Sequence, residues 1–139
     1  MNDFIESVTS QLGLDESTAK GATGSVLGFL KSGLGDQFSE IANKLPGAED
    51  LISAAPDPGE SGGGGGGLLG SITQAASSML GGKAGEGMDL MGSLGNLGLS
   101  TDQGGSLVSM LIDYIKEKVG EQAVAMITEK LPILKSVLG

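Results

Sequence analysis

Carboxylates are the side chains best suited to chemistry in this sequence, because it contains no histidine and no cysteine. Two adjacent acid pairs, Asp15–Glu16 and Glu49–Asp50, would suit metal binding or proton transfer. Neither pair has the ligand spacing of a calcium loop. Asp15 is better placed to cap a helix, and Glu49–Asp50 to occupy a first helical turn, where negative charge is favourable. We therefore expect structural roles for both pairs.

Glycine-rich stretches suggest a second kind of chemistry, the binding of phosphate groups. A phosphate-binding loop requires a strand, the pattern G-x-x-x-x-G-K-[ST] and a helix. Here Gly81-Gly82-Lys83 is followed by Ala84, and Ser77 stands where the first glycine of the pattern belongs. We expect linkers at these glycines and at Gly62–Gly67. No catalytic, cofactor-binding or metal-binding residue is predicted, and no enzyme, because the commonest general base and the thiolate nucleophile are both missing.

The charge of the chain is strongly negative, with a net value of −9 and no arginine among its eight basic residues. Residues 1–60 hold ten acids against three lysines, so most of the excess lies in the first part. Nucleic-acid binding needs cationic clamps and stacking aromatic side chains, and the chain has one Tyr and three Phe. We therefore expect no nucleic-acid partner.

Targeting segments are not expected either. Met1–Glu6 has neither a basic region nor an apolar run, so a cleaved signal peptide is not predicted. The longest uncharged stretch, 61–82, contains too many Gly and Ser residues for a membrane span. The compartment stays open, with the cytoplasm as the default and export without a cleaved signal as the alternative.

A pseudo-repeat organises the sequence: residues 11–52 resemble residues 96–138. Leu12-Gly13-Leu14 aligns with Leu97-Gly98-Leu99, and Lys44-Leu45-Pro46 aligns with Lys130-Leu131-Pro132. Repeated units of this kind cover one another's apolar faces. Duplication is therefore our interpretation, and chance similarity between two helix-turn-helix segments is the alternative.

Helix boundaries follow from caps and glycines. In the first half we expect a helix from an Asp3/Glu6 capping box to about residue 11, a helix over 16–33 capped by Asp15, a third capped by Asp36, and one or two turns over 48–54. In the second half an S-x-x-Q capping box at Ser100 begins a helix that Gly120 ends, and a helix over 121–131 follows.

No alternating pattern indicates a strand, so the predicted fold class is all-α. We predict a helix-bundle-like arrangement of two similar units joined by a Gly-rich linker. The expected boundaries are 1–56 for the first helical unit, 57–87 for the linker and 88–139 for the second unit. The linker should contain one short helix over 68–80, and a weak helix should start at Met88.

Two helix faces are candidates for an interaction surface. Gly21, Gly24 and Gly28 lie within the predicted helix 16–33, where small residues allow a second helix to approach closely. The contact could lie inside the chain or between subunits. The other face is broad and apolar, and it comprises Leu107, Val108, Leu111, Ile112 and Ile115. The first repeat, a partner chain or a lipid-like ligand could cover it.

A family resemblance rests on the stretch Leu-Pro-Gly-Ala-Glu-Asp-Leu-Ile-Ser-Ala-Ala-Pro at residues 45–56, after the Leu-Gly-Leu and the Gly-rich helix. This stretch is similar to a bacterial family of unknown function called VcgC/VcgE. The resemblance covers residues 8–56 well and the second unit more loosely. It implies a small helical bacterial protein, and it brings no activity, cofactor or site residue.

These patterns favour a non-enzymatic structural or interaction protein. We expect a homo-oligomer that self-associates through helix faces and can extend into a polymer, because unequal surfaces on one chain pair head to tail. The alternative is a helical module that binds a lipid or another apolar ligand in a cleft lined by Met and Leu.

Overall fold

The computed structural model describes residues 1–55, 83–132 and 134–135. All regular structure within these ranges is helical, so the all-α prediction is confirmed. The elements in chain order are α1 (Asn2–Leu12), α2 (Glu16–Leu34), the 3₁₀ turn η1 (Gly35–Gln37), α3 (Phe38–Lys44), α4 (Ala48–Ala54), α6 (Lys83–Asn96), α7 (Thr101–Val119) and α8 (Glu121–Lys130).

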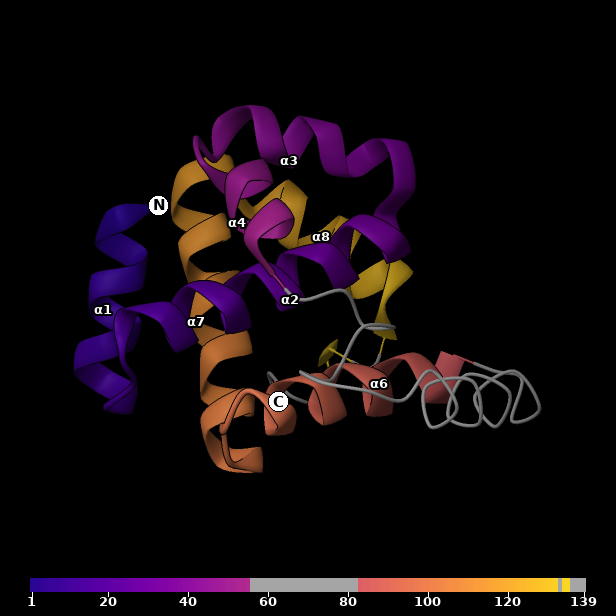
Figure 1. Cartoon of the computed structure of the whole chain (residues 1–139). Helices are drawn as coiled ribbons and strands as arrows, with labels where there is room; N and C mark the ends of the chain where they lie inside the picture. The colour runs from indigo at the N-terminus through magenta and orange to yellow at the C-terminus, as the bar shows by residue number, and fades with distance from the viewer. Residues whose placement is uncertain (56–82, 133, 136–139) are drawn as a thin grey trace.

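Helix α2 lies at the centre of the molecule and contacts α1, α3, α4, α6, α7 and α8 (Figure 1). From Ala19 to Leu27 every residue of α2 except Lys20 and Ser25 is buried. A helix surrounded in this way cannot present large side chains in all directions. Small residues in its middle therefore allow its neighbours to pack closely.

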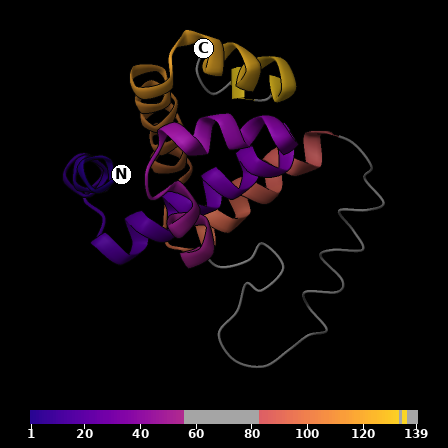
Figure 2. The ribbon, with the colours of Figure 1, turned by 90° about the horizontal axis from the view of Figure 1, so that it is seen from above.

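Helix α7 is the second long helix and crosses α2 at a steep angle (Figures 1 and 2). We call residues 1–55 the first half, and residues 83–132 with 134–135 the second half. Helix α7 contacts α1 and α3 from the first half as well as α6 and α8 from the second. The buried apolar side chains of both halves form one continuous hydrophobic core. The described part of the chain is therefore held together by contacts between the halves as well as within them.

Several local predictions are confirmed. Asp15 caps α2 by accepting a hydrogen bond from the Thr18 backbone N–H at 3.0 Å. Ser100 and Gln103 form the expected reciprocal capping box at the start of α7. Gly35 and Gly120 are the C-caps of α2 and α7, both with positive φ. These devices depend on residues a few positions apart, which explains why the sequence predicts them.

Two predicted caps are wrong. The first helix begins at Asn2 with Met1 as its N-cap, so Asp3 lies inside the first turn and makes no capping box. Met1 is held there because its ammonium group donates to the Pro46 carbonyl oxygen at 3.2 Å. Asp36 caps no helix, because it lies inside the 3₁₀ turn that connects α2 to α3.

After residue 55, the described chain resumes at Lys83, the first residue of α6. Residues 57–82 of the expected linker lie outside the described residues, and so does the whole of the short helix expected over 68–80. The last five linker residues, 83–87, form the beginning of α6 instead. The helix expected from Met88 therefore starts five residues earlier, in a segment that contains the good helix formers Lys83, Ala84 and Glu86.

Candidate interaction surfaces

The glycines of α2 form a close contact with α4 inside the chain. A Cβ atom built on Gly24 would lie 2.1 Å from the Leu51 carbonyl oxygen and 2.7 Å from the Ala55 Cβ, so only glycine allows this approach. At Gly28 the nearest atom to such a Cβ is a methyl carbon of Ile52 at 4.0 Å. Gly21 is buried as well. Within the described structure, the contact at Gly24 is therefore intramolecular, and Gly28 is not needed for it.

The apolar face of α7 is covered by the same chain. Leu107, Leu111 and Ile115 have no exposed surface, Val108 is 1% exposed and Ile112 is 3% exposed. The covering helices are α1, α2 and α3 from the first half together with α6 and α8. Within the described ranges, the first half and the neighbouring helices therefore bury this face.

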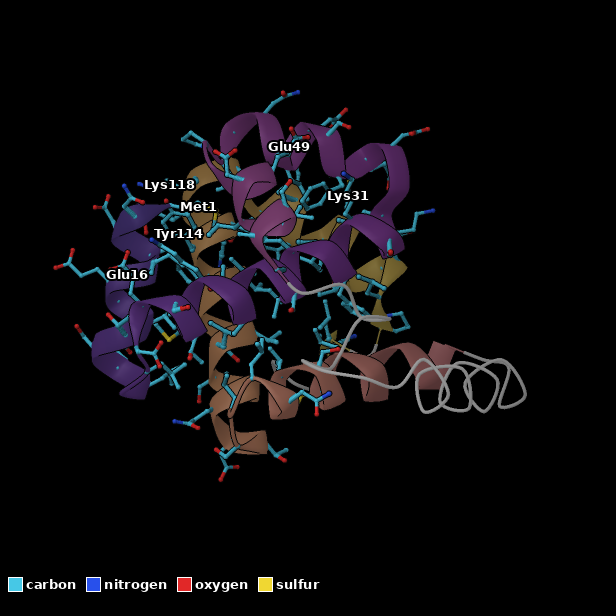
Figure 3. The ribbon with its side chains drawn as sticks, viewed as in Figure 1. Met1, Glu16, Lys31, Glu49, Tyr114 and Lys118 are labelled. Atoms are coloured by element: carbon cyan, nitrogen blue, oxygen red, sulfur yellow. The ribbon has the colours of Figure 1, made fainter. Side chains whose placement is uncertain are left out.

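Aromatic side chains join the two halves at one end of the molecule. The Phe4 ring of α1 lies against the Tyr114 ring of α7, with their centroids 5.2 Å apart. The Lys118 ammonium lies 5.6 Å from the centroid of the Tyr114 ring (Figure 3). Such contacts add cation–π and aromatic attraction to the burial of apolar area.

One further polar contact crosses between the halves near the other end of α1. The Gln103 side-chain amide donates to the Leu12 carbonyl oxygen at 2.9 Å. This carbonyl belongs to the last turn of α1, where backbone acceptors lack helical partners. The same glutamine completes the capping box of α7 through Ser100. It therefore joins the start of α7 to the end of α1.

A shallow groove of about 570 Å³ lies between the end of α1 and the first half of α7. Its residues are Gln11, Leu12, Thr101, Asp102, Gly105, Ser106, Ser109 and Met110. Small residues at successive helical turns of α7 leave this space open, and Leu12 and Met110 contribute its apolar surface. The sequence suggests a cleft lined by Met and Leu only as an alternative, and none of these groove residues is among the predicted interaction residues, although Gly105 and Ser109 are spaced by one turn.

The two acid pairs have the structural roles expected of them. The backbone and side-chain hydrogen bonds from Thr18 lower the pKa of Asp15. The hydrogen bond from Lys20, followed by its charge, lowers the pKa of Glu16. Glu49 and Asp50 lie in the first turn of α4. Within the described ranges, no three potential metal ligands gather in one place.

A single buried polar side-chain atom is left without a partner among the described residues. The Thr23 hydroxyl in the middle of α2 is fully buried and makes no hydrogen bond. Buried polar groups are nearly always hydrogen-bonded, and an unsatisfied one costs stability. Thr23 is therefore a point at which α2 can be stabilised by substitution.

The fold defines a small all-α protein whose two halves share one core. Residues 1–132 match the family described as "Protein of unknown function VcgC/VcgE (DUF2780)", and the chain belongs to this family. Comparison with curated proteins and with solved structures finds no significant match in either group. None of the helices in the described ranges has both the length and the apolar character needed to cross a bilayer.

Proposed function

We propose that this protein is a non-enzymatic structural or interaction protein, built from two copies of one helical unit and able to associate with itself. The observation that supports the proposal is the correspondence between the halves. Each half contributes one long helix of 19 residues, α2 or α7, and each of these helices begins at a side-chain cap. Units of this kind are stable only when a neighbour covers their apolar faces.

The connecting segments support duplication further. Gly13 and Gly98, with φ angles of 66° and 94°, precede the caps of the two long helices. The short helices after α2 and α7 end in the same backbone conformation: Leu45 has φ −114° and ψ 82°, and Leu131 has φ −124° and ψ 73°. Each of these leucines is followed by a proline. Ten residues separate the cap glycine from this leucine in the second half and nine in the first, which agrees with one insertion.

The packing also supports two complementary units. The leading helix of each half, α1 or α6, contacts both long helices. The first short helix after each long helix, α3 or α8, likewise contacts both α2 and α7. Each half therefore covers the long helix of the other half with equivalent helices. A second copy of the chain could supply the same covering surface.

The composition favours a binding role over catalysis. The sequence has no histidine and no cysteine. Its two acid pairs serve the starts of helices, as described above. The proposal therefore assigns the protein no reaction.

Sedimentation velocity and light scattering from about 1 µM to about 1 mM test self-association, and negative-stain microscopy distinguishes closed oligomers from polymers. We expect the mass to rise with concentration. A strict monomer throughout this range would overturn the proposal.

The groove between α1 and α7 favours a second candidate function, the binding of a lipid or another apolar ligand. Leu12 and Met110 give part of its lining apolar character. A co-purifying lipid in native mass spectrometry would support this function. The variant Ser106→Tyr should then abolish binding of a fluorescent fatty acid, whereas Ser32→Tyr, at an exposed position of α2 outside the groove, should not. Equal binding by both variants would exclude the groove.

A further inference from the structure

The contact surface between the two halves is mainly apolar, because the buried side chains of both halves form one hydrophobic core. It includes the Phe4–Tyr114 ring pair and the close fit of Leu131 beside Gly33, where a Cβ atom on the glycine would lie 2.4 Å from a Leu131 methyl carbon. Each of the ion pairs among the described residues lies within one half. Apolar burial therefore dominates this surface, as in the interface of an obligate dimer.

The connection between the halves is long. Helix α4 is followed by Ala55, the next described residue is Lys83, and 27 residues, 56–82, join them. At a maximum of about 3.4 Å per residue these residues can span up to about 90 Å. A first half can therefore reach the second half of its own chain or that of a neighbour.

Energetically, the two arrangements are nearly equivalent. Exchanging halves between copies recreates the described side-chain contacts between the halves, so for these residues the main difference is the entropy of association. The half on the same chain competes with halves on other chains, and its effective concentration is in about the millimolar range. The closed monomer should thus prevail in dilute solution, and exchange should increase as the protein concentration approaches that range.

We propose that the protein self-associates by exchanging halves: residues 1–55 of one copy pack on residues 83–135 of a second copy through the surface that closes the monomer. This inference rests on the proposed function and gives it an interface. Reciprocal exchange between two copies gives a closed dimer, and exchange onward to further copies gives a chain. Interconversion should be slow, because the shared core must open first.

Cysteine pairs provide the test, because the natural chain has no cysteine. Gln11 and Ser106 are both exposed and line the same groove from different halves. The full-length Gln11→Cys/Ser106→Cys variant is unfolded, refolded at about 1 µM or about 1 mM, separated by size and treated with a short bis-maleimide. Gln11→Cys/Asp102→Cys is a second pair across this groove.

The control pair lies within one half. Asn43 and Glu49 line a separate groove of about 330 Å³ between α3 and α4, and both are exposed. The Asn43→Cys/Glu49→Cys variant should be cross-linked within a single chain whether or not halves are exchanged. It therefore reports any cross-linking between molecules that merely collide.

If halves are exchanged, the oligomer fraction of the cross-linked Gln11→Cys/Ser106→Cys variant should run as a covalent dimer or ladder on a denaturing gel. The cross-linked Asn43→Cys/Glu49→Cys control should run as a monomer. The covalent dimer should increase at least about tenfold between the two refolding concentrations. Oligomers whose Gln11/Ser106 pair is cross-linked only within one chain would overturn the exchange and leave self-association intact. Absence of any oligomer would overturn the proposed function as well.

Discussion

Replacing Gly24 by alanine tests the close contact between α2 and α4. The new Cβ would lie 2.1 Å from the Leu51 carbonyl oxygen, so the α4 backbone must move by about 1.3 Å or more to restore an ordinary contact. The same oxygen accepts a hydrogen bond from the Ala55 N–H at 3.0 Å, which hinders local adjustment. Overpacking of this kind costs about 3 kcal/mol at the upper end of its usual range.

Helix propensity offsets part of this cost, because alanine is favoured over glycine in a helix by about 1 kcal/mol. The expected net loss is about 2 kcal/mol, or about 8 °C in Tm for a chain of this size. Gly28→Ala is the matched control: it lies one turn further along the same helix, and the nearest atom to its Cβ is 4.0 Å away. It should gain up to about 1 kcal/mol.

Thermal unfolding monitored by circular dichroism, together with hydrogen exchange of the α4 amides, measures the outcome. The hydrogen-exchange measurement is needed because Gly24→Ala could release α4 without unfolding the other helices. Equal Tm values for the two variants, combined with unchanged α4 protection, would refute the argument that glycine is required at Gly24.

Three further predictions concern single side chains. Thr23→Val replaces the unpartnered buried hydroxyl with a methyl group and should raise stability by about 1 kcal/mol in chemical denaturation; a loss would show that the hydroxyl is bonded. Because hydrogen bonds from Thr18 lower the pKa of Asp15 in the folded state, the stability that this carboxylate contributes is full above its unfolded pKa and is lost as pH falls below about 4. Asp15→Asn should therefore weaken the acid dependence of Tm, and identical pH profiles would contradict this. Ser100→Ala removes the cap of α7 and should cost about 1 kcal/mol, whereas Ser100→Thr, which keeps the hydroxyl, should stay near the natural protein in the same denaturation assay.

Local sequence determines the helices to a large extent. The caps at Asp15 and Ser100, and the stops at Gly35 and Gly120, act over three or four residues, so they are visible without a structure. The cap expected at Asp3 fails for a non-local reason. Met1 takes the N-cap position, and its ammonium group is held by a carbonyl 45 residues away.

The candidate surfaces depended much more on the fold. Gly24 and Gly28 lie one helical turn apart in α2, yet α4 lies too close for a Cβ atom at Gly24 alone. The groove between α1 and α7 arises where two helices from different halves meet, and its lining residues are ninety positions apart. Spacing within one helix cannot report such a contact.

By itself, then, the sequence determined the fold class, most helix ends and membership of the VcgC/VcgE family, because propensity, capping and the family pattern are properties of neighbouring residues. Only the tertiary structure decided which apolar faces meet. It buries Leu107, Leu111 and Ile115 within the chain, since apolar surface is non-directional and packs against whichever complementary surface the chain brings to it.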